Sequence, residues 1–397
     1  MQLFNPTEYL KIDIASNFGM DKSSWDDRIR WFNDNENNLL QMLSQAKEPA
    51  LYYAGVMAWH DVQKGLPSGY PISLDATASG FQLLAVLTGD TSAASICNVV
   101  ESGKREDAYT VIYQRMLSEI GDTAKIERDE VKQAVMTSLY GSEAVPKDVF
   151  GKGQMLGIFY EVMQQTAPAA WELNEAFLSM WDSEVYEYNW VLPDNFHVRT
   201  KVMDTIKETV HFMNQPFDVY RKVNQPSESG RSLGANAIHS LDAMIVREMT
   251  RRCDYDPAII MRCIAAIEEP REIVSDSDTR MVRTLWAHYE KTGYLSARIL
   301  NHLKASNAAI VDPAPVWELI ESLPEKPFKL LTVHDCFRCL PNYGNDLRMQ
   351  YNRQLMEIAR SDILSSIISQ IIQRDVTIGK LDPKLHEKIM AANYALS

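Results

Sequence analysis

Apolar residues recur every three or four positions through most of this chain, which is the spacing of one buried helix face. The pattern predicts helices over residues 25–47, 79–87, 105–120, 126–139 and 233–252, with Gly121-Asp-Thr123 between the third and the fourth. Helical spacing also fills much of the remaining sequence. We therefore expect a mostly helical protein.

Three segments depart from this spacing. Ile72-Ser-Leu74 is a short apolar run that ends at Asp75, and Phe328 to Val333 is another that ends at His334-Asp335. Residues 189–223 alternate and contain many β-branched and aromatic side chains, which predicts a hairpin. The expected fold class is α+β, with a small sheet that carries an aspartate at each of two strand ends.

The composition says more about the cellular compartment of the protein than about its activity. The 397 residues include five cysteines, an odd number that fits a reducing compartment better than a set of disulfides. No apolar run is long enough to cross a membrane, and the first residues lack a signal-peptide pattern, so we expect a cytosolic protein. The net charge of −13 disfavours nucleic acid as a partner, because phosphate binding needs Lys and Arg, but it leaves room for a local basic channel.

Asp75 and Asp335 are candidate metal ligands. Joining a nucleotide to a growing strand needs in-line attack at phosphorus, and two metal ions about 4 Å apart stabilise the attacking and leaving oxygens. Mg²⁺ is usually held by one or two carboxylates and by substrate phosphates. Two aspartates at neighbouring strand ends would meet that need, although a lone aspartate there is more often a turn or helix cap.

The helix between the two aspartates supplies cations and an aromatic ring. Arg128, Lys132, Met136 and Tyr140 are four residues apart, so they lie close to one helix face. The cations would meet a triphosphate, and the tyrosine would meet a base or sugar. A spaced Arg/Lys pair is more often a solvated face, so the specificity lies in the order and spacing of all three segments.

This order resembles a known family, the T7-like single-subunit DNA-dependent RNA polymerases. Three segments are similar to its motifs A, B and C, in that order: Asp75-x3-Ser79-Gly80-x-Gln82, Arg128-x3-Lys132-x3-Met136-Thr137-x2-Tyr140-Gly141 and His334-Asp335-x-Phe337. Further similar segments are Asp21-Lys22, Trp190 to Asp194 and Asn236 to Asp242. The resemblance covers nearly the whole chain.

The resemblance implies a role for each matching residue. Asp75, Asp335 and the backbone carbonyl of Ala76 would hold two Mg²⁺ ions. Lys22, Arg128 and Lys132 would contact the incoming triphosphate, and Lys132 would also protonate the leaving pyrophosphate.

Three aromatic side chains complete the implied site. Tyr140 would lie near the insertion site and, with His239, sense the ribose 2′-hydroxyl. Tyr109 would line the same site. The plain alternative for His239 is a buried core histidine.

Two alternatives remain beside an RNA polymerase. DNA polymerases of family A share this skeleton, but their motif A usually carries a glutamate where this chain has Ser79-Gly80, and their motif B an aromatic residue where it has Met136. Both differences favour ribonucleotides. The first alternative is a fragment of such a DNA polymerase, and the second is a non-catalytic scaffold of a transcription complex.

By resemblance, the chain would form the palm and fingers of a right-hand polymerase. Residues 1–103 would be the first part of the palm, and residues 104–239 the fingers with a shortened specificity hairpin at about 200–229. Residues 240–397 would be the second part of the palm, with a helical insertion at about 254–325. The thumb, the N-terminal domain and the family's Asp-x-x-Gly-Arg motif find no match in this sequence.

This gap predicts a heterodimer. The chain resembles the larger subunit of the heterodimeric RNA polymerase II of N4-like phages, which implies a second subunit with the Asp-x-x-Gly-Arg motif and the thumb. The other implied partners are a single-stranded or melted DNA template, RNA, nucleoside triphosphates and an accessory or recruitment protein. The implied location is the cytoplasm of an infected bacterial host, without a membrane contact.

Two smaller features have plainer interpretations. Cys336-x2-Cys339 has the spacing of half a zinc site, but no second pair accompanies it, which favours packing. Tyr394 to Ser397 resembles the aromatic end of the family's chains, which folds back near the active site. The alternative for this segment is a frayed tail.

Overall fold

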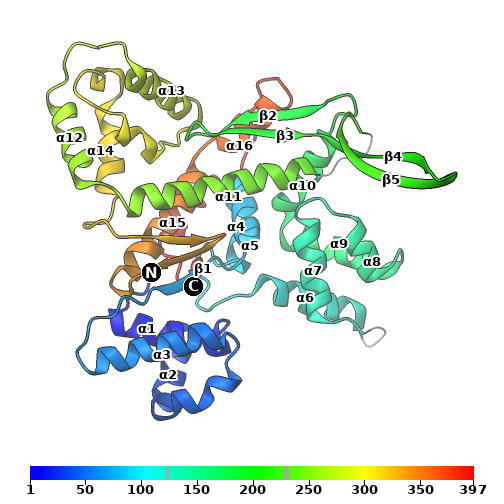
Figure 1. The fold of residues 1–397 in the computed structure, drawn as a ribbon, viewed down its shortest axis with the longest axis horizontal. Coiled ribbons are helices and arrows are strands. Elements are labelled where there is room, and N and C mark those ends of the chain that lie inside the picture. Colours follow the sequence, from blue (N-terminus) through cyan, green and yellow to red (C-terminus); the bar gives the residue numbers. More distant parts are fainter. Residues whose placement is uncertain (122–124, 228–231) are drawn as a thin grey trace.

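In the computed structural model, which describes residues 1–121, 125–227 and 232–397, helices surround a small central sheet (Figure 1). The expected α+β class, mostly helical with small antiparallel sheets, is therefore confirmed. The described residues include no helix that is long and apolar enough to span a membrane.

The central sheet has three antiparallel strands in the order β1-β7-β6. They are β1 (Ile72–Asp75), β6 (Leu331–Val333) and β7 (Cys336–Cys339). The strand predicted from Phe328 begins only at Leu331, and His334 turns the chain into β7 with a φ of 55°. Since Asp75 pairs with Cys336, the two predicted aspartates meet at one end of the sheet.

Two long helices pack beside the sheet. In α4 (Ser79–Thr88) every residue after Ser79 is buried, and the helix packs against α15 (Gly344–Arg360). Their apolar faces belong to the main core, together with much of α11 (Ser232–Cys253). The shorter elements of this region are α5 (Thr91–Ile96), η6 (Pro341–Tyr343), α16 (Ile363–Ile371) and α17 (His386–Ile389).

The N-terminal residues form a small helical unit with a core of its own. It contains α1 (Pro6–Ala15), η1 (Ser16–Met20), α2 (Trp25–Asn35), η2 (Glu36–Gln45) and α3 (Pro49–Gln63). Ser24 caps α2, as its position before an acidic first turn suggests. The helix predicted over 25–47 changes at Glu36 into a 3₁₀ helix, which ends at Gln45.

A second helical lobe follows the central sheet (Figure 1). It consists of α6 (Ala108–Ile120), α7 (Arg128–Ser138), α8 (Ala144–Phe150), α9 (Gln154–Thr166) and α10 (Pro168–Ser179). The helix expected from Arg105 starts later, because the Asp107 side chain caps it. Placing Tyr140 on the motif helix was wrong: α7 ends at Ser138, and Tyr140 lies in the turn that follows. Residues 122 and 123 of the predicted linker lie outside the described residues.

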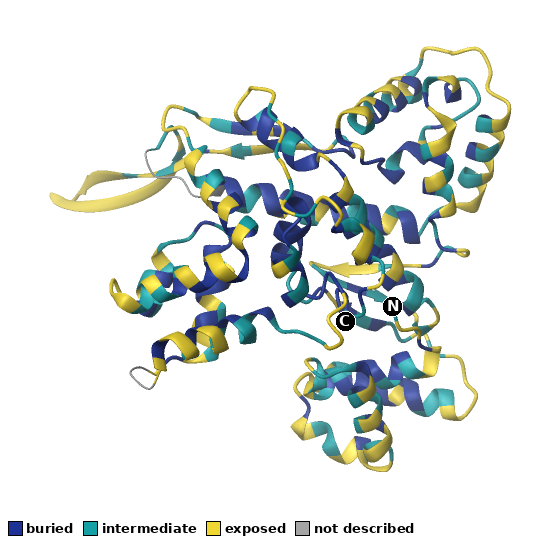
Figure 2. Ribbon diagram, turned by 180° about the vertical axis from the view of Figure 1, so that it is seen from behind, coloured by how far each residue is buried: buried dark blue, intermediate teal, exposed yellow. Residues whose placement is uncertain are grey.

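Two hairpins occupy the segment for which one was predicted. One pairs β2 (Glu187–Val191) with β3 (His197–Lys201), and the other pairs β4 (Met203–Phe212) with β5 (Gln215–Asn224). The second hairpin projects from the body of the protein and is exposed along its length (Figures 1 and 2). The last two residues of the hairpin expected at about 200–229 lie outside the described residues.

Residues 257–321 form a further helical unit with a separate hydrophobic core. It comprises α12 (Pro257–Glu268), α13 (Ser277–Thr292), η4 (Ala297–Asn301), η5 (Ala308–Ile310) and α14 (Pro313–Glu321). Buried polar contacts join it to α11, where Glu248 accepts hydrogen bonds from the Ser296 hydroxyl at 2.5 Å and from the Ala297 amide at 2.8 Å.

Candidate active site

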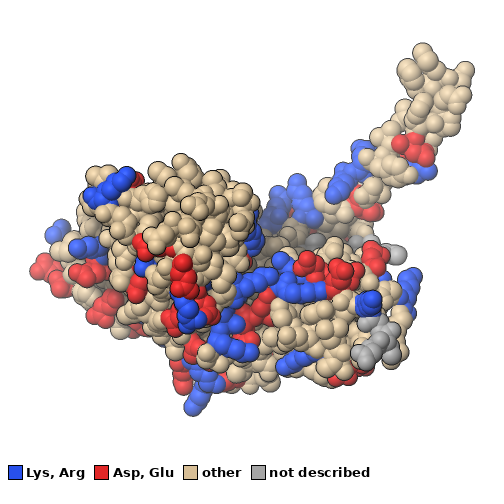
Figure 3. All heavy atoms as spheres, turned by 90° about the horizontal axis from the view of Figure 1, so that it is seen from below, with Lys and Arg blue, Asp and Glu red and all other residues tan. Residues whose placement is uncertain are grey.

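A cleft of about 270 Å³ opens beside the end of β1. Its charged lining residues come from the N-terminal unit, β1, the start of α6 and α7: Asp21, Lys22, Asp75, Arg105, Glu106, Asp107, Arg128 and Lys132. Seen from below, Lys and Arg side chains, with Asp and Glu side chains among them, gather in the hollow between the N-terminal unit and the lobe of α6 to α10 (Figure 3). Four of these lining residues are cations and four are acids, so the cleft is balanced in formal charge, whereas the whole chain has a net charge of −13.

The structure brings most of the predicted site residues to this cleft. Six of them line it: Lys22, Asp75, Ala76, Tyr109, Arg128 and Lys132. Asp335, Tyr140 and His239 are not among the lining residues, but they lie next to the cleft through contacts described below.

Asp75 and Asp335 lie side by side because β1 and β7 pair. The Ala76 amide donates to the Asp335 carbonyl at 3.1 Å. The Asp75 side chain is open to solvent, yet the surrounding protein partly desolvates it and, with the nearby Asp335 carboxylate, raises its pKa. A cation between or beside two such like charges would offset their repulsion.

The donors at this position suit Mg²⁺ better than zinc. Among the described residues, no group of three or more His, Cys, Asp or Glu side chains is arranged to hold a metal. Two carboxylates and the Ala76 carbonyl are an oxygen-only set, and Mg²⁺ commonly takes its other ligands from water and substrate phosphates. Cys336 and Cys339 are three residues apart on β7 and so point to opposite faces, which fits packing.

Arg128 is held in place by a residue that sequence reasoning did not select. Its guanidinium donates to the Asp107 carboxylate at 2.5 Å and to the Thr110 hydroxyl at 2.8 Å. Burial opposes ionisation of Asp107, but the bond from Arg128 outweighs it and lowers the Asp107 pKa. The sequence signal for Asp107 was its position as a helix cap.

Lys132 lies one turn further along α7. Its Nζ atom is 5.7 Å from the centroid of the Tyr109 ring. Burial raises the pKa of Tyr109 to about 12, and the charges of Asp107 and Asp335 act in the same direction. The tyrosine is therefore a neutral wall of the cleft beside a lysine.

Tyr140 and His239 stack on one another although 99 positions separate them in the chain. Their ring centroids are 4.7 Å apart, with an angle of 17° between the planes. A Cβ atom at Gly80 would lie 2.1 Å from the Tyr140 hydroxyl oxygen, so no larger residue fits at Gly80. Met136, in contrast, is 43% exposed on α7 and does not line the cleft.

Asp242 is a second site residue that sequence reasoning did not select. It lies three residues after His239 on α11, hence on the same helix face. Burial and the nearby Asp335 carboxylate raise the pKa of Asp242 to about 6. Burial, followed by the charges of Asp242 and Asp335, raises the pKa of Tyr140 to about 12.

The last residues of the sequence fold back onto the cleft, so their interpretation as a frayed tail is wrong. Tyr394 stacks on Trp25 with a centroid distance of 5.3 Å. Leu396 forms a β-bridge with Ala76, and the Ser397 amide donates to the Asp75 carbonyl at 2.8 Å. Ser397 also lines the cleft.

Sequence comparisons relate part of the chain to polymerases. A probable DNA-directed RNA polymerase of Podospora anserina is 35% identical over 108 residues, which are 24% of this chain and 11% of that protein. A probable DNA-directed RNA polymerase of a Gelasinospora species is 22% identical over 382 residues, 88% of this chain and 41% of that protein. The DNA-directed RNA polymerase of Pseudomonas phage phiKMV is 25% identical over 142 residues, 32% of this chain and 17% of that protein.

The alignments cover less than half the length of each of these relatives. Residues 5–148 match the family model described as DNA-dependent RNA polymerase. This segment contains Lys22, Asp75, Arg128 and Lys132, which all line the cleft. The part of the chain that forms the cleft is thus similar in sequence to the DNA-dependent RNA polymerases.

Proposed function

We propose that this chain carries the catalytic centre of a phage DNA-dependent RNA polymerase, which adds ribonucleotides from nucleoside triphosphates to the 3′ end of RNA. One observation carries the proposal. A single cleft joins the carboxylate of Asp75 to the cations Arg128 and Lys132, beside Asp335. Much of that cleft lies in the segment that matches the polymerase family model.

The metal chemistry rests on the oxygen donors at the sheet end. Asp75, Asp335 and the Ala76 carbonyl would hold two Mg²⁺ ions, whose charge stabilises the attacking and leaving oxygens of phosphoryl transfer. Burial, with a further contribution from the Asp335 charge, raises the pKa of Asp75, and a bound cation would favour the charged form of this carboxylate.

The cations and aromatic rings would bind the nucleotide. Lys22, Arg128 and Lys132 would contact its triphosphate, and Lys132 would give a proton to the leaving pyrophosphate. The stacked Tyr140 and His239 would face the ribose. Because Gly80 has no side chain, the Tyr140 hydroxyl can approach the start of α4 closely, which would fix the position of the ring that faces the ribose.

The parts of the fold would correspond to those of a right-hand polymerase. The central sheet and its helices would be the palm (1–103 and 240–397), and the lobe of α6 to α10 the fingers (104–239). The β4–β5 hairpin would be a short specificity hairpin, and the 257–321 unit would be the helical insertion. These assignments rest on the resemblance and on the arrangement in Figure 1.

A second subunit would supply the thumb and the Asp-x-x-Gly-Arg motif, as in the heterodimeric enzymes of N4-like phages. This proposal rests on the resemblance of the chain to the larger subunit of those enzymes. Template DNA, RNA and an accessory protein would be further partners. The similarity to a phage enzyme supports the cytoplasm of an infected bacterium as the location.

An assay of RNA synthesis on single-stranded DNA tests the proposal. The chain is purified alone and with the product of the neighbouring reading frame. Ribonucleotide-dependent synthesis by the pair, lost on Asp335→Asn with assembly intact, is the expected result. Full activity by the chain alone would exclude the split enzyme, a preference for deoxyribonucleotides would indicate a DNA polymerase, and activity that survives Asp335→Asn would remove the metal assignment.

A further inference from the structure

Arg105 is a cation of the cleft that no polymerase motif accounts for. It lies just before α6 and lines the cleft together with Lys22, Asp75 and Lys132. Its Nε atom donates to the Ser397 hydroxyl at 3.4 Å, a long hydrogen bond. Within the described part of the chain, no carboxylate lies within 4.0 Å of its guanidinium.

The neighbouring carboxylates are already engaged by other cations. Asp107 pairs with Arg128 at 2.5 Å, and Asp21 pairs with Lys47 at 3.2 Å. Burial lowers the pKa of Arg105, while Asp107 and Asp21 act in the opposite direction from a distance. A guanidinium stays charged in a protein and has five N–H donors, so Arg105 retains donors for a ligand.

A partly desolvated cation without a close anion costs free energy unless a ligand neutralises it. The cleft gives that ligand a place, since it is also lined by Lys22 and Lys132, which form no ion pair with any residue that the structure describes. Arg128 differs, because its guanidinium is held by Asp107 and Thr110 on α6. Planar guanidinium groups bind phosphate oxygens in pairs, which a lysine cannot do.

We infer that Arg105 is a substrate-binding residue that contacts the triphosphate of the incoming nucleotide, beside Lys22 and Lys132. This inference rests on the proposed function and extends it to a residue outside the three motifs. A phosphate of the RNA strand offers the same chemistry, so the experiment separates the two sources. The structural alternative is that Arg105 only holds Ser397 in place.

Four variants of the complete two-subunit enzyme test the inference. Arg105→Ala removes the charge and Arg105→Lys keeps it. Ser397→Ala removes only the long hydrogen bond. Lys104→Ala is the matched control, because Lys104 is the neighbouring cation, its side chain is 72% exposed, and it is not among the residues that line the cleft.

Steady-state kinetics give the first readout. Arg105→Ala is expected to raise the KM for nucleoside triphosphates about tenfold or more, as loss of a charge-assisted hydrogen bond does, with a smaller change in kcat. Arg105→Lys should recover part of the loss, and Lys104→Ala and Ser397→Ala should stay within about twofold. An unchanged KM, an effect on RNA affinity alone, or the same effect from Ser397→Ala would overturn the inference.

Binding of tripolyphosphate gives a readout that does not need catalysis. Calorimetric titration should show weaker binding to Arg105→Ala than to the unsubstituted enzyme, by a factor similar to the change in KM. Equal binding by both proteins would overturn the role of Arg105. If the enzyme binds tripolyphosphate through Arg105 but makes no RNA, the proposed function fails while the anion site stands.

Discussion

Two aspartates at the ends of short strands show opposite uses of the same side chain. Asp75 ends β1, is open to the cleft, and has a raised pKa because of partial desolvation and the Asp335 carboxylate. Asp194 lies in the turn between β2 and β3 and is fully buried. Burial opposes its charge, but Arg247 and Arg251 outweigh that effect and lower its pKa.

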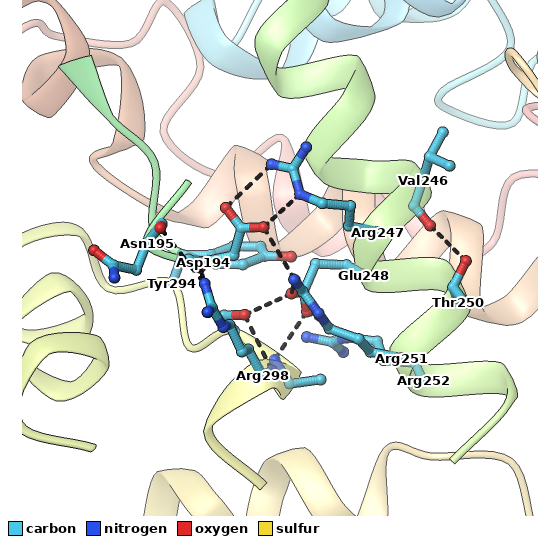
Figure 4. Close-up of polar contacts among 12 residues, drawn as sticks. Asp194, Asn195, Val246, Arg247, Glu248, Thr250, Arg251, Arg252, Tyr294 and Arg298 are labelled. Atoms are coloured by element: carbon cyan, nitrogen blue, oxygen red, sulfur yellow. Dashed lines mark hydrogen bonds and ion pairs between the residues drawn. The ribbon is translucent and has the colours of Figure 1, made fainter. Parts of the chain in front are cut away.

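The surroundings of Asp194 form a closed network (Figure 4). Arg247 donates to both of its carboxylate oxygens at 2.6 and 3.2 Å, and Arg251 bridges it to Glu248. Arg298, from the 257–321 unit, donates to the Asp194 carbonyl at 2.9 Å. Charges paired within the protein join parts of the fold, whereas Asp75, for which the described residues provide no ion-pair partner, is available to a ligand at the cleft.

Asp75→Asn should have the largest effect on activity and little on stability. The loss of a metal-binding carboxylate is expected to reduce RNA synthesis by about a thousandfold or more, because metal stabilisation is worth several kcal/mol. The free energy of unfolding should stay the same or rise, since one of two neighbouring like charges is gone. Parallel measurements of synthesis and of urea unfolding check this, and a large loss of stability would contradict it.

Asp194→Ala should show the reverse pattern. Removing the buried carboxylate leaves Arg247 without its ion-pair partner and Arg251 with Glu248 alone, and is expected to cost about 3–5 kcal/mol of unfolding free energy. Urea unfolding followed by circular dichroism gives the value. A change below about 1 kcal/mol, the range of exposed pairs, would show that the network does not hold the fold together.

Asp13 is an intermediate case, because it is buried and hydrogen-bonded but forms no ion pair with any of the described residues. The Ser73 amide and the Tyr70 hydroxyl each donate to it at 2.7 Å, yet burial raises its pKa from 3.8 to about 6. The folded state therefore binds the proton more tightly, and this contribution to stability is present below pH 4 and lost as the pH rises through 6.

The variant Asp13→Asn tests this direction of the pH dependence of stability. The unfolding free energy of the variant relative to the unsubstituted protein should increase between pH 4 and pH 7, by up to about 3 kcal/mol. Denaturant unfolding at several pH values measures this difference. A constant difference across the range would mean that Asp13 stays charged in the folded protein.

Glu318→Gln should have the smallest effect. The ion pair of Glu318 with Arg360 also crosses from the 257–321 unit to the body, but both side chains are about half exposed, at 58% and 46%. Its loss is expected to change the unfolding free energy by less than about 1 kcal/mol. A cost similar to that of Asp194→Ala would break the distinction between exposed and buried pairs.

The sequence motifs predicted the main residues of the cleft, but they did not predict the neighbouring residues that hold them in position or complete the lining. Asp75, Arg128 and Lys132 stand in short motifs with fixed spacing, and the structure brings them to one cavity. Asp107 and Arg105 were not selected, because a cap and a lone arginine look ordinary in a linear pattern. The division into palm, fingers and insertion stays a prediction, and so do the individual roles of the site residues.

By itself, the sequence determined the local features of this protein. Helical periodicity set most helices, apolar runs set the two strands of the candidate site, and both runs end at an aspartate. These features depend on neighbours a few residues away, so a linear pattern contains them.

Only the tertiary structure decided which charges are satisfied. Asp194 meets Arg247 across 53 positions, and Tyr140 meets His239 through the packing of α11 against the turn after α7. Desolvation and pairing depend on distances in space, which spacing along the chain does not encode. For that reason the sequence located the acids of the cleft, but the fold determined that Asp75 remains open to a ligand while Asp194 is enclosed.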